Sequence, residues 1–323
     1  MIFITEVSKK LGEERDFMLT YEDFKEKVAR SFVDYLSDEF KGSKNVIVHI
    51  RPVEKINRTL DGISLADSEG RTVSPVIYVN DMYEQYRRYG NVNDVMRVFV
   101  KTMEREIREF QDYPLPDLTD ADSKIVFQLV NTEQNRKLLQ GMPHREFHNL
   151  SVIYRLVVKS DGQGMHSAVI KNGLAKMLEF DEGQLFRLAK NNTRKLFPPL
   201  VKPIGDFLCE ELNLLKPGLD ETGIRVITNE SKVNGAACIL YGDVLHELSE
   251  KLHDDLYILP SSLHEVIAVP ASMGKPDGLA QMVCEVNETG VEPEDRLSNR
   301  VYHYDRDLRT LTVATDMADR KLA

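Results

Sequence analysis

Cysteine is scarce in this sequence, and its three copies are dispersed. Cys209, Cys238 and Cys284 lie far from one another, and each has apolar neighbours. A disulfide framework needs cysteines at close, regular spacings, and a structural zinc site needs paired ligands a few residues apart. The pattern therefore indicates small buried apolar side chains in a reducing compartment, and it predicts no structural zinc ion.

Long apolar runs are absent as well. Segments such as residues 266–269 are interrupted by charge well short of the ~18 residues that a membrane-spanning helix needs. The N-terminal segment meets Glu6 and two lysines too early for a signal peptide. The sequence thus predicts a cytoplasmic protein without a membrane partner.

Motifs that bind common cofactors are missing too. The sequence contains no G-x-x-x-x-G-K-[ST] phosphate loop, no G-x-G-x-x-G dinucleotide turn and no G-x-S-x-G hydrolase elbow. We therefore predict no cofactor. The formal net charge of -10 repels phosphate backbones at long range, so nucleic acid is disfavoured as a partner. The adjacent Arg87 and Arg88 are accordingly interpreted as part of a solvated helix face.

Residues 234–270 form the most regular stretch of the chain. An apolar run predicts a strand at 236–241, and Asp243 predicts a capped helix start before apolar residues recur at helical spacing. Two more apolar runs flank Pro260, Ser261 and Ser262 and predict a hairpin with a loop of about three to five residues. The sequence therefore predicts a strand-helix-hairpin unit here, with the hairpin strands at residues 256–259 and 266–269.

A chain of 323 residues favours two domains. Residues 112–123 contain two prolines and four aspartates with no hydrophobic period, which is typical of a linker. We therefore predict an N-terminal helix and small-sheet domain at residues 16–111 and a C-terminal α+β domain at residues 124–323.

In the N-terminal part, Thr20 and Asp23 form a capping pattern before a helix that the apolar period extends to Phe40. Long amphipathic helices are expected at 81–89 and 92–110. Alternating residues predict a small antiparallel sheet with strands at 46–50, 56–65 and 72–79.

In the C-terminal part, strands and helices are mixed, which favours the α+β class. Asp181 and Gln184 predict a capped helix at 182–197, and a second helix is expected at 200–214. Asp277 is expected to cap a third helix. Further strands are predicted at residues 124–130, 150–158, 167–170, 224–228, 301–304 and 311–314.

One constellation combines a nucleophile, a base and a carboxylate, namely Ser261, Ser262, His264 and Glu265. On one extended strand, Ser262 and His264 share a face ~6.6 Å apart while Glu265 points to the other face. A contiguous catalytic triad therefore requires that the turn curls or that partners come from elsewhere. In the alternative interpretation, these hydroxyls satisfy the backbone of the turn.

The histidines do not predict a metal site. His144 and His148 bracket Glu146 as H-R-E-F-H, but the zincin motif places its glutamate beside one histidine on a long helix. His246 and His253 are ~10.5 Å apart along a helix axis, which is too far for one ion. We therefore predict no metal ligands.

Four segments resemble a bacterial family. They are SPVIYVNDMYEQYRRYG, LVNTEQNRKLLQGMPHREFHNLSVIYR, LFRLAKNNTRKLFPP, and NGAACILY followed by YILPSSLHEVIAVP. Together they make the chain similar to domain of unknown function 5688 over residues 21–307. The resemblance implies an origin in anaerobic gut Firmicutes and an association with mobile elements. It implies no activity, substrate or cofactor.

The missing cofactor motifs and the long amphipathic helices favour a non-catalytic cytoplasmic binding or regulatory protein. Its partner is expected to be a protein or a small molecule whose identity the sequence does not give. The alternative hypothesis is a hydrolase that uses Ser262 and His264.

Overall fold

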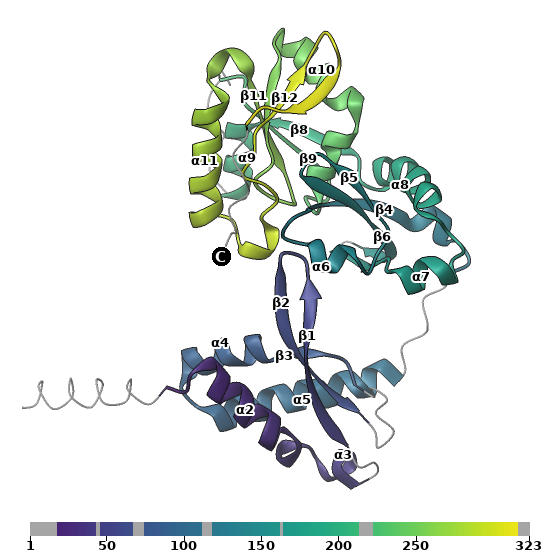
Figure 1. Cartoon of the computed structure of the whole chain (residues 1–323), viewed down its shortest axis with the longest axis vertical. Helices are drawn as coiled ribbons and strands as arrows, with labels where there is room; N and C mark the ends of the chain where they lie inside the picture. The colour runs from purple at the N-terminus through teal and green to yellow at the C-terminus, as the bar shows by residue number, and fades with distance from the viewer. Residues whose placement is uncertain are drawn as a thin grey trace, which may run out of the picture. The chain divides into compact units, whose positions relative to one another are not determined.

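The computed structural model describes residues 18–42, 46–66, 74–111, 118–161, 164–212 and 222–315 (Figure 1). The chain divides into two compact units. Unit 1 comprises Met1–Lys55 and Thr59–Leu115, and unit 2 comprises Ile56–Arg58 and Pro116–Ala323. Helices accompany antiparallel sheets in both units, so the predicted α+β class is confirmed. Of the predicted linker, residues 112–117 lie outside the described ranges.

Unit 1 combines long helices with a small antiparallel sheet, as predicted. Thr20 caps the first helix by accepting a hydrogen bond from the backbone N–H of Asp23. Phe24, Met82 and Met103 come from three different helices and are fully buried in one core. The helices are α2 (Tyr21–Ser31), α3 (Asp38–Gly42), α4 (Val79–Tyr89) and α5 (Val92–Gln111), and the strands in sheet order are β1 (Ile47–Lys55), β2 (Arg58–Ala66) and β3 (Ile77–Tyr78).

Two elements of unit 1 are shorter than predicted. The first helix ends at Ser31 instead of reaching Phe40, and a 3-10 turn follows it. The backbone N–H of Ser37 then donates to the buried carboxylate of Glu104 on α5 (2.6 Å), so a tertiary partner replaces the helical hydrogen bond. Residues 72 and 73 of the strand predicted at 72–79 lie outside the described ranges, and the described part is reduced to β3, because the chain enters α4 directly after it.

The first sheet of unit 2 is built around the long strand β6. β4 pairs with one edge of β6, and β5 and β7 pair with successive parts of its other edge. α8 packs on β4 and begins with the predicted capping box between Asp181 and Gln184. The elements are β4 (Ile125–Asn131), β5 (His144–Phe147), β6 (Leu150–Asp161), β7 (Gly164–Val169), α6 (Arg136–Leu139), α7 (Asn172–Met177) and α8 (Glu182–Leu196).

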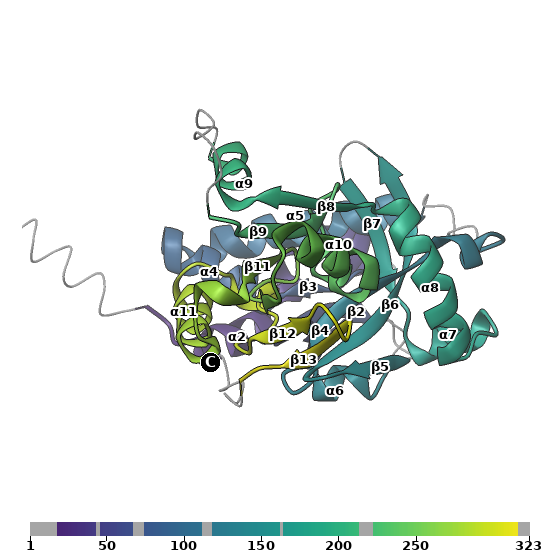
Figure 2. The ribbon, with the colours of Figure 1, turned by 90° about the horizontal axis from the view of Figure 1, so that it is seen from above.

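The second sheet of unit 2 has six antiparallel strands in the order β13-β12-β10-β11-β9-β8, so β8 is an edge strand. Its centre is the predicted hairpin, in which Ile258 pairs with Ala268. Figure 2 shows α10 alongside β8. The strands are β8 (Pro199–Pro203), β9 (Arg225–Asn229), β10 (Leu256–Leu259), β11 (Val266–Pro270), β12 (Tyr302–Asp305) and β13 (Thr310–Val313), and the helices are α9 (Ile204–Glu211), α10 (Gly242–Leu252) and α11 (Pro276–Thr289).

Alternate residues of the hairpin face two different cores. Ile258 and Val266 lie in the main core, to which both sheets of unit 2 contribute. Leu259 and Val269 point to the other face and pack in a smaller core with Val283 of α11. Both arms are apolar throughout because both faces of the hairpin are covered.

The strand predicted at 236–241 is wrong, because a 3-10 helix occupies Gly235–Leu240. Asn234 enters it with a φ of 54°, and a β-carbon on Gly235 would lie only 2.4 Å from the carbonyl oxygen of His264. The segment thus packs closely against β9 and the carbonyl of His264, and it forms no strand. The segment is apolar because it is buried, and burial alone does not distinguish a strand from a helix.

The helix predicted at 200–214 is also wrong at its start. Residues 199–203 pair with β9 as strand β8, and α9 begins only after Pro203. A proline disfavours the helical conformation in the residue before it, which here is Lys202. Two caps differ as well, since Asp243 and Asp277 lie in first helical turns whose N-cap positions belong to other residues.

Candidate functional site

Ser261, Ser262, His264 and Glu265 all lie in the turn between β10 and β11. Ser261 is 8% and Ser262 3% exposed, and the Ser262 hydroxyl oxygen accepts a hydrogen bond from the backbone N–H of His264 (2.9 Å). Burial raises the pKa of Glu265, and a hydrogen bond with Ser262 opposes that rise. The backbone N–H of Leu297 donates to the carbonyl of Ser261 (2.9 Å), so the chain around Leu297 covers this turn.

The imidazole of His264 is engaged at both nitrogens. Its Nδ1 accepts from the backbone N–H of Asn234 (3.2 Å), so the proton resides on Nε2, which lies 3.2 Å from a carboxylate oxygen of Asp295. A serine nucleophile needs a basic nitrogen within hydrogen-bond reach of its hydroxyl. In this described turn, Ser262 instead bonds to the main chain of His264. The geometry therefore favours the interpretation in which the hydroxyls satisfy the turn.

The H-R-E-F-H segment is not helical in the structure. His144, Arg145, Glu146 and Phe147 form strand β5, and His148 follows with a φ of 57°. Four residues along a strand span about 13 Å, against about 6 Å along a helix, so the spacing that a helical zinc motif requires is not reproduced. Among the described residues, no three histidine, cysteine or acidic side chains gather in a way that could hold a metal ion.

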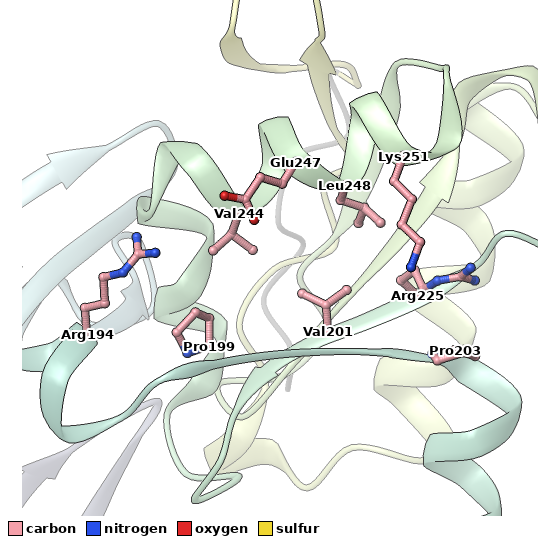
Figure 3. A pocket seen from close by; sticks show the side chains of 9 residues that line it. All are labelled: Arg194, Pro199, Val201, Pro203, Arg225, Val244, Glu247, Leu248 and Lys251. Carbon is pink, nitrogen blue, oxygen red and sulfur yellow. The ribbon is translucent and has the colours of Figure 1, made fainter.

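A pocket of about 360 Å³ lies between the edge strand β8 and helix α10. β8 contributes alternate residues, which share one face of the sheet, and α10 contributes residues spaced by three or four, which share one face of the helix. We call this site the α10–β8 pocket. Its lining consists of Arg194, Pro199, Val201, Pro203, Arg225, Val244, Glu247, Leu248 and Lys251 (Figure 3).

The α10–β8 pocket has an apolar centre and charged ends. Figure 3 shows Val201 and Leu248 facing each other between the strand and the helix. Lys251 and Arg225 lie together at the Pro203 end of the pocket. Lys251 has no counter-ion among the described residues, so this end is positively charged.

The opposite end of the pocket carries no net positive charge. Arg194 of α8 donates a hydrogen bond of 2.6 Å to the carboxylate of Asp243, and a second nitrogen of its guanidinium forms an ion pair with the same carboxylate (2.5 Å). This guanidinium lowers the pKa of Asp243, so the carboxylate stays ionised and the pair stays formed. Glu247 lies nearer to this end in Figure 3. The charge of the pocket is therefore asymmetric along its length.

The edge strand itself is poorly suited to pairing with another strand. Pro199 and Pro203 stand at the two ends of β8, and neither has a backbone N–H. Prolines on edge strands remove the donors that an added strand would use. The α10–β8 pocket is therefore better suited to side-chain recognition of a small molecule than to strand addition.

Sequence reasoning missed the α10–β8 pocket because it placed a helix where β8 lies. Three separate parts of the sequence, residues 194–203, Arg225 and residues 244–251, supply the lining, and their register depends on the pairing of β8 with β9. The proline after Lys202 was the local signal that could have excluded the helix. The charge of Lys251 was visible in the sequence, but its lack of a partner was not.

None of the helices in the described ranges has the length and apolar character that a membrane crossing requires.

The comparisons with known proteins identify the family of this chain. No significant match was found among curated proteins or among solved structures. A family model with the description "Family of unknown function (DUF5688)" matches residues 21–306, which is most of the sequence, and the chain therefore belongs to that family.

Proposed function

We propose that the protein is a non-catalytic binding protein whose unit 2 takes a small anionic molecule with an apolar body in the α10–β8 pocket. The observation that carries this proposal is the charge of Lys251 beside the apolar centre at Val201 and Leu248. Its volume of about 360 Å³ lies within the range of small-molecule sites, roughly 300–1,000 Å³.

The recognition would divide between the two parts of the pocket. The apolar body of the ligand would displace water from Val201 and Leu248, which supplies a favourable but unspecific term. Its anionic group would lie against Lys251, where a charge-assisted hydrogen bond supplies orientation. A cation of the same shape would meet like charge at that end, so the pocket would select by the sign of the charge.

The cellular setting belongs to the same proposal. The dispersed cysteines support a cytoplasmic location, and the resemblance supports a bacterial origin in gut Firmicutes with a role linked to mobile elements. In that setting, a bound metabolite would regulate what the protein contacts. A protein partner is part of the proposal, whereas the acidic net charge argues against nucleic acid.

Calorimetric titration of the full chain with octanoate tests the proposal. Octanoate should bind, and octylamine, which has the same chain length and the opposite charge, should not. Lys251→Met should weaken octanoate binding about tenfold, because it removes the charged partner and keeps the aliphatic stem. The matched control is Lys101→Met, which changes an exposed lysine of α5 in unit 1. Equal binding of octanoate and octylamine, or no effect of Lys251→Met, would reject the α10–β8 pocket as an anion site.

The alternative proposal is a hydrolase that uses Ser262 and His264. The observation in its favour is the contact of His264 Nε2 with Asp295, since a carboxylate commonly orients a catalytic imidazole. It requires the turn to rearrange so that the Ser262 hydroxyl meets the imidazole. Hydrolysis of 4-nitrophenyl acetate by the full chain that is lost in Ser262→Ala and retained in Ser261→Ala would support it. Equal rates for all three proteins would reject it.

A further inference from the structure

A second cavity, of about 240 Å³, lies in unit 2 and is separate from the α10–β8 pocket in its lining residues. Residues from both sheets line it, together with α8 and the start of α10. α10 contributes Gly242 and Leu245 here, whereas it contributes Val244 and Leu248 to the α10–β8 pocket. We call this site the inter-sheet cavity. Its walls come from segments that the main core holds together, which favours a preformed site.

Aromatic side chains form much of the wall of the inter-sheet cavity. Phe127 and Phe186 contact each other with ring centroids 5.4 Å apart, and the guanidinium of Arg145 lies 3.8 Å from the centroid of Phe186. Arg145 also donates two hydrogen bonds to Glu182, of 2.9 and 2.7 Å, and Tyr154 donates a third hydrogen bond to the same carboxylate. The guanidinium plane of Arg145 is therefore held in place by Glu182, and that carboxylate balances its charge.

One buried polar group lines this cavity without a hydrogen bond. The side chain of Tyr304 is part of the lining, the residue is 2% exposed, and its hydroxyl has no partner among the described residues. Burial raises the pKa of Tyr304, so the hydroxyl keeps its proton and remains a donor. A buried donor without an acceptor is unfavourable, and a ligand that supplies an acceptor would remove that cost.

The charged groups of the lining are unevenly balanced. Lys190 of α8 and Arg309 of the β12–β13 turn have no counter-ion among the described residues, and Glu146 is the acidic residue in the lining. With Arg145 already paired to Glu182, two cations face one carboxylate. The cavity therefore has an aromatic interior, a phenol donor and a net positive rim.

We propose that the inter-sheet cavity binds an aromatic carboxylate. The ring would lie against Phe127 and Phe186, and the carboxylate would accept a hydrogen bond from the Tyr304 hydroxyl while facing Lys190 and Arg309. Aromatic rings favour offset or edge contacts with other rings, which an aliphatic chain does not reproduce. This proposal does not depend on ligand binding in the α10–β8 pocket.

Fluorescence anisotropy of 2-naphthylacetate with the full chain provides the test. The sequence contains no tryptophan, so the naphthyl signal is read without indole emission. Tyr304→Phe keeps the ring and removes the hydroxyl, and it should weaken binding about tenfold. The matched control is Tyr241→Phe, because the Tyr241 hydroxyl is also buried without a partner among the described residues but does not line this cavity.

Two further variants test the positive rim of the inter-sheet cavity, and they apply even if Tyr304→Phe does not fold. Lys190→Met and Arg309→Met change exposed residues, and each should weaken 2-naphthylacetate binding, whereas Lys251→Met should leave it unchanged. Excess octanoate should not displace 2-naphthylacetate, because the two molecules are expected to bind in different cavities. A failure of one proposal is therefore measured independently of the other. The proposal is overturned if 2-naphthylacetate does not bind, or if Tyr304→Phe and Tyr241→Phe change its affinity equally.

Discussion

Gly235 lies where polar atoms of two neighbouring segments leave no room for a β-carbon. A Cβ there would lie 2.2 Å from Oγ1 of Thr228, 2.4 Å from the carbonyl oxygen of His264 and 2.8 Å from the backbone nitrogen of Asn229. Two of these three atoms belong to the backbone, so they cannot move aside as a flexible side chain would. The close approach also brings the Thr228 hydroxyl to the His264 carbonyl, to which it donates (2.7 Å).

We expect Gly235→Ala to destabilise the protein by about 3 kcal/mol, because the added methyl group forces the 3-10 helix away from β9. Urea unfolding measures this change. Gly278→Ala is the control, since Gly278 lies on α11 with no atom near its added Cβ, and alanine there should be neutral or slightly stabilising. A Gly235→Ala variant as stable as the Gly278→Ala variant would contradict the close packing at this residue.

At the scale of single elements, α8 was predictable and β8 was not. The capping box of Asp181 and Gln184 is a signal contained within four residues, and the apolar period of the helix is equally local. β8 exists because it pairs with β9, which follows α9 in the chain, so no local window contains the reason for it. The strand prediction at 236–241 was wrong for a similar reason. The 3-10 helix at Gly235–Leu240 depends on a close contact with His264, which is distant in the sequence.

Asp181→Ala should loosen the start of α8 specifically. The variant loses the hydrogen bond from the backbone N–H of Gln184 to the Asp181 carboxylate (2.7 Å). Its free energy of unfolding should fall by about 1 kcal/mol. Hydrogen exchange should be faster at the amides of the first turn and unchanged near Arg194. The control is Asp277→Ala, because Asp277 lies in the first turn of α11 without being its N-cap. Equal changes of amide exchange in the two variants would show that the Asp181 cap does not stabilise the start of α8 more than an acidic residue elsewhere in a first turn.

At the scale of the whole molecule, the sequence predicted the α+β class but could not assemble the candidate sites. The serine, histidine and glutamate of the β10–β11 turn are adjacent in sequence, which made them visible, yet their hydrogen bonds serve the turn. The inter-sheet cavity draws on residues from Phe127 to Leu311, and it forms only when both sheets of unit 2 enclose the main core. Adjacency in sequence therefore highlighted a turn, whereas the cavities depend on tertiary packing.

The division into domains at residues 112–123 stays a prediction, and limited proteolysis is its test. A 3-10 helix begins at Ala121, which is buried in the main core, so early cutting is expected before it. The prolines and acidic residues of 112–117 favour water over a core, and a broad-specificity protease should cut there first. The internal control is the turn at residues 260–265, which also contains a proline but has buried serines and should resist. The expected product begins near Lys124, remains soluble and retains slow amide exchange at Ile258 and Val266, which are buried in the main core. An insoluble product, or early cutting at residues 260–265, would mean that the C-terminal part does not fold as an independent domain.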